Sequence, residues 1–245
     1  MSEYNSDEQW SNTDSAFFLE YGQALIPDRD KLEQIFIDLL PRNTQEAFTV
    51  VDICVGGGWL TEAILTRYPR STVIALDGSE SMLEATRNRL ASYQDRVTYK
   101  TFDLHQSNWV DQLEPVDYFV SSLALHHLDD RGKEALFQRL YSALKPEGRV
   151  IIADLIKPNS ESSRLIAARE WDEIVKEQSE QLYGNLEAYD FFQRERWNLF
   201  YYPDDPIDKP SRLLDQIGWL SKAGFNHVEV LYYRAGHALI SGLKV

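Results

Sequence analysis

Cysteine is almost missing from this chain, and the shortage restricts the chemistry that the chain can carry. The 245 residues include a single cysteine, Cys54, which excludes an internal disulfide and any cysteine-rich zinc or iron–sulfur site. We therefore expect a reducing, cytoplasmic setting. The sequence has no apolar run near the roughly 20 residues of a membrane helix, and it does not start with the basic-then-apolar pattern of a secretory signal. No membrane partner is expected.

Positive charge is also in short supply. Lysine and arginine number 25 against 39 aspartate and glutamate residues, which gives a formal net charge of −14. Tight nucleic-acid binding needs clustered basic side chains against phosphate, and the sequence has no such cluster. The composition therefore disfavours nucleic acids as partners and leaves small molecules as the expected ligands.

A strand, three glycines and a helix follow one another at residues 49–65. Thr49 to Ile53 is β-branched apart from Asp52, which is typical of a buried parallel strand. Gly56 to Gly58 come next, and apolar residues then recur at helical spacing. A strand, a glycine turn and a helix N-terminus form the usual nucleotide cradle of open α/β sheets.

Acidic residues end the next predicted strands. Asp77 follows a strand over 71–76 and lies 21 residues after Gly56, the spacing at which an acid accepts hydrogen bonds from ribose hydroxyls. Asp103 follows a third predicted strand over 96–102. A dinucleotide fold would explain the glycines and Asp77, but Thr61 replaces the third glycine of its fingerprint.

The spacing Asp52-x-x-x-Gly56-x-Gly58 resembles motif I of the class I S-adenosylmethionine-dependent methyltransferases. The chain departs from that motif at Cys54, where the family has its first glycine. Two further stretches resemble the same family. Residues 123–130, which include His126 and His127, are similar to the L-x-H-H-L run that follows strand four in small-molecule members. Residues 144–152 are similar to the L-K-P-G-G run before strand five.

The resemblance implies S-adenosylmethionine as the cofactor, and it implies roles for particular residues. In related enzymes an acid at the position of Asp77 binds the ribose, an acid at the position of Asp103 binds the adenine amino group, and a methionine at the position of Met82 packs on the adenine. An N-terminal tyrosine often faces the pocket. The expected cofactor-binding residues are Asp52, Gly56, Gly57, Gly58, Asp77, Gly78, Met82, Asp103, Leu104, Ser122 and Tyr21.

Two adjacent histidines follow the fourth predicted strand, 116–122, and should border the reacting methyl group. One of them at most, His126 or His127, is expected to act as a general base, because neighbouring side chains cannot easily both face the substrate. The alternative is that a histidine only shapes the loop. No nearby residue completes a metal-ligand spacing, so no metal site is expected.

The predicted fold is α/β, a Rossmann-like doubly wound seven-stranded sheet whose last strand is antiparallel, with an aromatic-rich helical lid insertion. We expect a mobile polar N-terminus over 1–14 and one methyltransferase domain over 15–245. Cover helices fall in 15–41 and the lid in 155–210. Trp171, Trp197 and Tyr201 are the lid residues expected against the substrate. A homodimer interface and a plain helical core are the alternatives for this aromatic segment.

The predicted function is methyl transfer to an O, N or C nucleophile of a small molecule by in-line displacement. Two alternatives stay open. One is a protein of the same fold that binds S-adenosylmethionine without methyl transfer, as a scaffold or for other sulfonium chemistry. The other is an NAD-dependent dehydrogenase, which would leave Asp103 and the predicted C-terminal hairpin unexplained.

Overall fold

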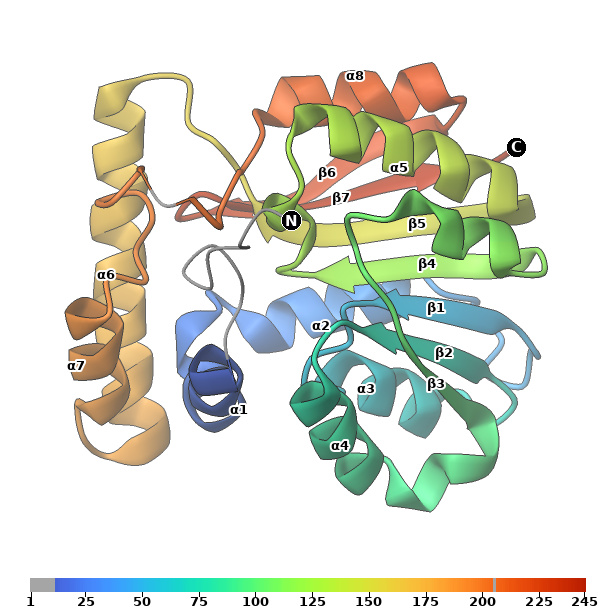
Figure 1. Ribbon diagram of the computed structural model, residues 1–245, viewed down its shortest axis with the longest axis horizontal. Helices are drawn as coiled ribbons and strands as arrows, with labels where there is room; N and C mark the ends of the chain where they lie inside the picture. The colour runs from blue at the N-terminus through green and yellow to red at the C-terminus, as the bar shows by residue number, and fades with distance from the viewer. Residues whose placement is uncertain (1–11, 205) are drawn as a thin grey trace, which may run out of the picture.

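A computed structural model describes residues 12–204 and 206–245. It consists of one central sheet with helices on both faces and a further group of helices beyond one end of the strands (Figure 1). The strands are β1 (Thr49–Ile53), β2 (Thr72–Asp77), β3 (Val97–Thr101), β4 (Val116–Ser122), β5 (Leu144–Leu155), β6 (Asn226–Arg234) and β7 (His237–Leu243). The α-helices are α1 (Asn12–Leu25), α2 (Arg29–Asp38), α3 (Trp59–Arg67), α4 (Glu80–Arg89), α5 (Asp130–Ala143), α6 (Glu161–Tyr183), α7 (Glu187–Arg194) and α8 (Leu213–Ala223).

The sheet has the strand order β3-β2-β1-β4-β5-β7-β6. Strands β1 to β5 pair in parallel, and β7 inserts antiparallel between β5 and β6. The order reverses between β1 and β4, which is where open α/β sheets bind their ligands. The predicted fold class, including the antiparallel last strand, is confirmed.

Apolar side chains cover both faces of the sheet, as the β-branched strands require. One buried cluster includes Phe36 and Ile64 and lies under α2 and α3. Another includes Phe119, Phe137 and Leu220 and lies under α5 and α8. The two clusters fix the parallel strands, so that the residues at their carboxyl ends lie along one edge.

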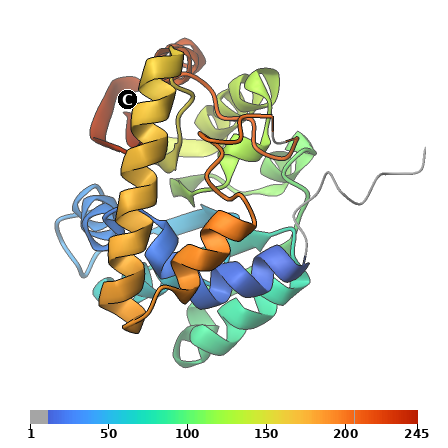
Figure 2. The ribbon, with the colours of Figure 1, turned by 90° about the vertical axis from the view of Figure 1, so that its left-hand side faces the viewer.

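A third buried cluster lies beyond that edge and joins α1 to α6 and α7 (Figures 1 and 2). Phe17 stacks on Phe191, with ring centroids 3.3 Å apart, and Trp171 donates from Nε1 to the carbonyl of Leu25 at 2.8 Å. The helical insertion therefore covers the carboxyl ends of the strands together with α1.

Several boundaries differ from those predicted. Of the expected mobile N-terminus, residues 1–11 lie outside the described residues, whereas Asn12 to Asp14 form the first turn of α1. Strand β5 begins at Leu144, which pairs with Val116, and residues 145–148 continue the strand, with Glu147 and Gly148 bonded to the backbone of Lys244. Within the described ranges, no helix combines the length and the apolar character that crossing a bilayer requires.

Candidate cofactor and acceptor site

The loop between β1 and α3 uses left-handed backbone at three positions. Cys54, Gly56 and Gly58 have φ angles of 57°, 54° and 78°. A β-carbon built on Gly56 would meet nothing within 4 Å, so open space lies beside its backbone. Cys54 occupies a conformation that glycine adopts more easily, which explains why glycine suits that position in the motif.

Asp52 lies beneath this loop and is 2 % exposed. Its Oδ2 accepts a hydrogen bond from the Thr61 hydroxyl at 2.6 Å, which joins the end of β1 to the first turn of α3. Burial raises the pKa of Asp52 to about 7, although the Thr61 hydrogen bond acts in the opposite direction. The carboxylate thus stabilises the shape of the loop from within the core.

Asp77 ends β2 beside the glycine loop. Its two oxygens accept hydrogen bonds from the backbone N–H groups of Gly56 at 2.8 Å and Ser79 at 2.9 Å. Burial raises the pKa of Asp77, while those N–H groups hold it down. A carboxylate has about four lone-pair sites, so Asp77 keeps capacity for further donors.

Helix α1 crosses the glycine loop. A β-carbon on Gly57 would come within 2.8 Å of Leu19 Cδ2, and the hydroxyl oxygens of Ser15 and Ser79 lie 3.3 Å apart. The predicted pocket residue Tyr21 lies on the same helix, where its ring packs edge-on against Tyr183 of α6. The N-terminal helix is therefore in contact with the loop that it was expected to cover.

The remaining predicted cofactor residues lie at neighbouring strand ends with different exposure. Met82 is 3 % exposed on α4, whereas Gly78 and Asp103 are exposed. The Asp103 carboxylate accepts from His105 N–H and the Gln106 amide, both at 2.9 Å, and Leu104 follows it.

These residues fit the expected cofactor on two observations. The space beside Gly56 leaves room for a ligand against the backbone. Ser122, at the end of β4, has a buried hydroxyl without a hydrogen-bond partner among the described residues. A ligand with polar groups at this edge would satisfy it.

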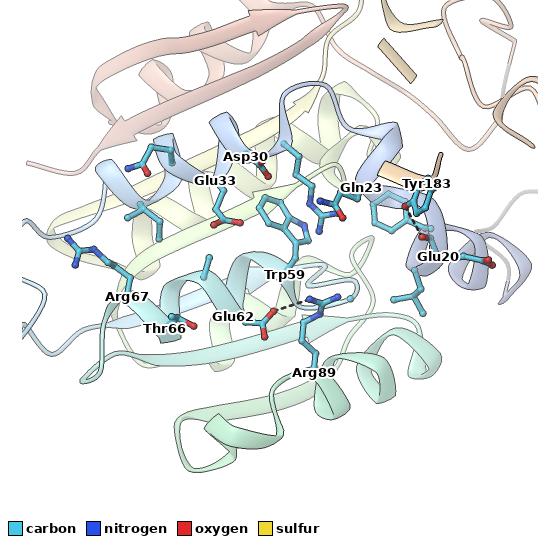
Figure 3. Close-up of a pocket in the computed structure, with 17 residues that line it drawn as sticks. Glu20, Gln23, Asp30, Glu33, Trp59, Glu62, Thr66, Arg67, Arg89 and Tyr183 are labelled. Carbon is cyan, nitrogen blue, oxygen red and sulfur yellow. Dashed lines mark hydrogen bonds and ion pairs between the residues drawn. The ribbon is translucent and has the colours of Figure 1, made fainter. Parts of the chain in front are cut away.

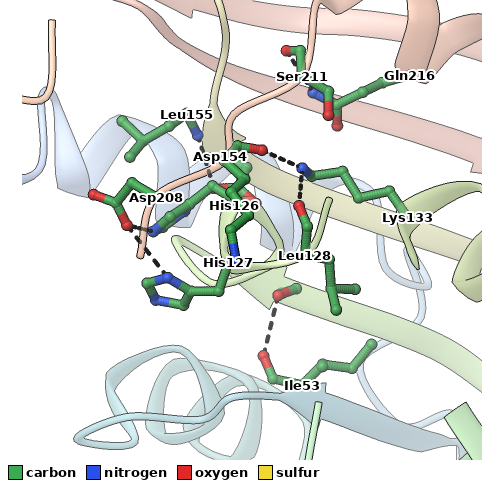
Figure 4. A network of polar contacts seen from close by, with 12 residues as sticks. Ile53, His126, His127, Leu128, Lys133, Asp154, Leu155, Asp208, Ser211 and Gln216 are labelled. Carbon is green, nitrogen blue, oxygen red and sulfur yellow. Dashed lines mark hydrogen bonds and ion pairs between the residues drawn. The ribbon is translucent and has the colours of Figure 1, made fainter. Parts of the chain in front are cut away.

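The two adjacent histidines contact carboxylates that come from distant parts of the chain (Figure 4). His126 Nδ1 lies 2.5 Å from Asp154 Oδ1, at the end of β5. On its other side, His126 Nε2 lies 3.4 Å from Asp208 Oδ1. His127 Nδ1 lies 3.3 Å from the same oxygen of Asp208.

The pKa values of the two histidines shift in opposite directions. Burial alone would lower the pKa of His126, but Asp154 and Asp208 outweigh burial and raise it. Burial lowers the pKa of His127, and the neighbouring His126 lowers it further. The pKa of Asp154 is lowered because His126 outweighs the effect of burial. At neutral pH, His126 therefore carries the positive charge more readily than His127 does.

Backbone contacts fix the segment that carries Asp208. Lys209 N–H donates to the His126 carbonyl at 2.7 Å. The buried Lys133 Nζ donates to the carbonyls of Lys209 and Leu128, each at 2.5 Å. Sequence analysis did not select Asp208, because no spacing rule connects it to residues 126–127. The reason for expecting no metal site, the lack of a completing ligand, does not hold in three dimensions.

Two clefts border this end of the molecule. One, of about 580 Å³, is lined by Asp208, Lys157, Arg164 and Phe200 among others. The other, of about 790 Å³, lies between α1, α2 and α3 and touches the glycine loop only at Gly57 (Figure 3). Neither histidine lines the first cleft, but Asp208, which contacts both histidines, does.

The predicted lid residues are differently placed. Trp171 is 5 % exposed in the cluster with α1, and the Trp197 ring lies edge-on to Phe17 at 5.1 Å. Tyr201 is 40 % exposed. The two tryptophans thus belong to the layer over the strand ends, while Tyr201 lies at its surface.

Comparison with known proteins identifies the family. The family model described as a methyltransferase domain matches residues 50–148, which carry the glycine loop, Asp77 and the two histidines. Residues 50–148 belong to a methyltransferase domain of the class I S-adenosylmethionine-dependent type. This confirms the resemblance drawn from the motifs, and S-adenosylmethionine is the cofactor of that family.

Individual relatives of this methyltransferase extend the comparison. Trans-aconitate 2-methyltransferase from Variovorax paradoxus is 34% identical over 107 residues, which are 44% of this chain and 38% of that protein. Carboxy-S-adenosyl-L-methionine synthase from Nitratiruptor sp. is 22% identical over 213 residues, 84% of this chain and 80% of that protein. An O-methyltransferase family protein from Burkholderia thailandensis has a similar fold, with a TM-score of 0.65 and 15% identity over 95% of this chain and 60% of that chain.

The match to the first relatives is partial. The chain spans 38% of the Variovorax protein and 57% of an uncharacterized methyltransferase from Oceanobacillus iheyensis.

Proposed function

We propose that the protein transfers the methyl group of S-adenosylmethionine to an O, N or C nucleophile of a small molecule. The observation that carries the proposal is Asp77, whose carboxylate lies beside the open space at Gly56 and is oriented by two backbone N–H groups. Such a carboxylate suits ribose hydroxyls. The proposed cofactor-binding residues are Asp52, Gly56, Gly57, Gly58, Asp77, Gly78, Met82, Asp103, Leu104, Ser122 and Tyr21.

The bound cofactor supplies an electrophilic methyl group on a sulfonium, so the protein has to align the nucleophile and exclude water. Helix α1 covers the glycine loop, and the aromatic layer with Trp171 and Trp197 closes the end of the sheet. The cleft beside Asp208 has room for the acceptor.

One histidine at most acts as the base. His127 suits that role better than His126, because its lowered pKa leaves it neutral at physiological pH. Asp208 lies 3.3 Å from His127 Nδ1 and would orient the ring.

The likeness to a carboxy-S-adenosyl-L-methionine synthase over most of the chain supports a second candidate, other chemistry at the sulfonium. Mass spectrometry separates the two. Methyl transfer converts S-adenosylmethionine to S-adenosylhomocysteine and adds a methyl group to the acceptor, whereas the alternative changes the cofactor itself.

Calorimetric titration with S-adenosylmethionine tests the cofactor site directly. We expect saturable binding that Asp77→Ala and Asp103→Ala weaken at least about tenfold, since each removes a charged hydrogen-bond acceptor. Asp111→Ala is the matched control, because this acid is exposed and forms its ion pair with Arg139, at 2.6 Å, away from the glycine loop. Equal binding by all three variants would contradict the assignment.

The acceptor wall needs a separate measurement. Trp197→Ala should raise the KM for the acceptor while the Kd for S-adenosylmethionine stays nearly constant. Equal loss of both in a folded variant would favour the plain helical core, and dissociation of an oligomer would favour the homodimer interface.

We retain the expectation of a cytoplasmic protein, based on the single Cys54.

A further inference from the structure

Three side chains of metal-binding type converge at the carboxyl ends of β4 and β5. A ring nitrogen from each of His126 and His127 and a carboxylate oxygen of Asp208 all lie within 4.8 Å of one another. Their side chains are 6 %, 19 % and 21 % exposed, so the group is largely withdrawn from solvent. Two imidazoles and one carboxylate make up a common protein ligand set for zinc.

The distances in this group are long for charge-assisted hydrogen bonds and also fit the spacing of ligands around a metal ion. Asp208 Oδ1 lies 3.4 Å from His126 Nε2 and 3.3 Å from His127 Nδ1. Charge-assisted N–H···O bonds are usually about 2.7–2.9 Å long. Ligands at about 2.0–2.1 Å from a tetrahedral zinc ion are separated by about 3.3–3.4 Å. The two measured edges therefore leave room for an ion between the atoms.

Asp154 lies behind His126 in the position that a carboxylate commonly takes behind a metal-binding histidine. Asp154 Oδ1 lies 2.5 Å from His126 Nδ1, the nitrogen that faces away from the cluster. A carboxylate in this position holds the proton on Nδ1 and directs the Nε2 lone pair towards the ligand position. Figure 4 shows His126 between Asp154 on one side and Asp208 on the other.

The ligand from the distant segment is held in place by the backbone around it. Lys209 N–H is bonded to the carbonyl of His126, and Lys133 binds the carbonyl of Lys209. Asp208 is thus attached directly to the loop that carries both histidines. This preorganisation lowers the entropic cost of assembling a three-ligand site.

We propose that His126, His127 and Asp208 bind a divalent zinc-like cation, with Asp154 as the positioning residue behind His126. Since Asp208 also lines the 580 Å³ cleft, a cation bound to it would border the space proposed for the acceptor. With the cation bound, His127 would be a ligand in place of the base role given to it above, and an acceptor oxygen or sulfur bound to the cation would lose its proton more readily. The proposal goes beyond methyl transfer and does not depend on it.

Zinc titration of the chelator-treated protein tests the site without any cofactor. We expect one zinc ion per chain by calorimetry, and an intense visible absorption band with Co²⁺ in tetrahedral coordination. Asp208→Asn should weaken zinc binding at least 100-fold and abolish the band. Asp204→Asn removes the same charge from an exposed position of the same loop and should leave both unchanged.

Two further variants make the result specific. His127→Ala should reduce zinc affinity as strongly as Asp208→Asn, whereas His105→Ala, at an exposed loop position, should not. Asp154→Asn should weaken affinity about 10–100-fold and keep the cobalt band, as expected for an outer partner. Circular dichroism checks that each variant is folded.

Stoichiometric zinc binding that survives Asp208→Asn, or no zinc binding by the folded wild-type protein, would overturn the proposal. Titration with S-adenosylmethionine on the same samples separates this result from the proposed function. A wild-type protein that binds S-adenosylmethionine but no zinc refutes only the metal site, and a wild-type protein that binds zinc but no S-adenosylmethionine refutes only the methyltransferase assignment.

Discussion

The carboxyl edge of the sheet has two halves, a cofactor half with Asp52 and Asp77 and an acceptor half, named after the proposed acceptor, with Asp154 and Asp208. The pKa values of the buried carboxylates are raised in the first half and lowered in the second. In the cofactor half, Asp52 and Asp77 are surrounded by hydroxyl and backbone N–H donors, and burial raises both pKa values. In the acceptor half, Asp154 and Asp208 lie against His126, which lowers both pKa values in spite of burial. Neutral hydrogen-bond donors offset only part of the cost of burying the charges of Asp52 and Asp77. The ionisable His126 offsets that cost for Asp154 and Asp208.

The difference shows where a ligand has most to contribute. A ribose or other hydroxyl ligand adds donors to Asp77, whose charge the polypeptide alone leaves costly. The acceptor half already has balanced charges, so a ligand entering it must displace or extend an existing network. Substitutions that remove charge should therefore have opposite effects on stability in the two halves.

The largest effect is expected at Asp52. Because its pKa of about 7 exceeds the ordinary value of 3.8, the native state keeps a proton that the unfolded chain loses above about pH 4. Stability should fall as the pH rises from 4 to 7, by as much as about 4 kcal/mol. Asp52→Asn should remove this dependence and be more stable than the wild type at pH 8. Urea unfolding from pH 4 to pH 8 measures the free energy of unfolding of both proteins. Parallel pH profiles of the wild type and Asp52→Asn would contradict the expected effect of the buried Asp52.

Asp154→Asn should act in the other direction. It leaves His126 buried without its partner carboxylate at 2.5 Å, and we expect the free energy of unfolding to fall by about 3 kcal/mol. Asp77→Asn is the matched substitution in the cofactor half, and it should change stability by less than about 1 kcal/mol because the amide oxygen still accepts N–H. Chelator in both samples removes any contribution from bound metal. Equal losses of stability in Asp154→Asn and Asp77→Asn would contradict the difference between the two halves.

A pair of glycines tests the packing of the acceptor half. A β-carbon on Gly236 would lie 2.2 Å from the ring of Phe200, and its φ is +74°. Gly184 has a similar φ of +69° and nothing within 4 Å. Gly236→Ala should therefore destabilise the protein by about 2–3 kcal/mol more than Gly184→Ala, which costs about 1 kcal/mol. Thermal unfolding gives both values, and similar values would show that Phe200 moves freely.

The pair of His126 and Asp154 predicts a smaller, pH-dependent effect on stability. Because the pKa of His126 is raised, its stabilising contribution is complete below about pH 6.5 and is lost as the pH rises through the folded-state pKa. The lowered pKa of Asp154 gives the opposite limb, lost as the pH falls through its folded-state value. His126→Gln should remove the alkaline limb in metal-free protein. An unchanged alkaline limb in urea titrations would assign it to another group.

The smallest effect is expected at Cys54. Replacing it with glycine relieves a φ of 57° but loses a partly buried side chain, so the two contributions nearly cancel within about 1 kcal/mol. The Kd for S-adenosylmethionine should stay within about twofold of the wild type. A large gain in affinity would show that the side chain at position 54 restricts the site.

The cofactor half could be predicted from sequence because its parts are local. Asp52, Gly56 and Thr61 belong to one continuous strand–loop–helix unit, and Asp77 ends the next strand, so spacing in the chain determines spacing in the fold. The helix caps at Ser79, Asp129 and Gly224 are local in the same way, because each lies next in the chain to the helix that it caps.

The acceptor half could not be predicted in this way. Asp208 lies 81 residues after His127 and contacts it only because an irregular segment returns to the sheet edge. Lys133, whose position on α5 suggests a solvent-exposed lysine, is 1 % exposed and binds two carbonyls of that region. Such contacts depend on tertiary packing, which neither periodicity nor motif spacing encodes.

The turn between β6 and β7 has a consequence for synthesis on the ribosome. Its N–H at Ala235 binds Glu170 of α6, its carbonyl at Gly236 accepts from Ile156, and Phe200 packs against it. The aromatic layer is therefore translated before the turn that anchors it. A nascent chain that has not yet extended past Gly236 contains β1 to β4 and α1, but its aromatic layer lacks the contacts of this turn and can pack only on α1.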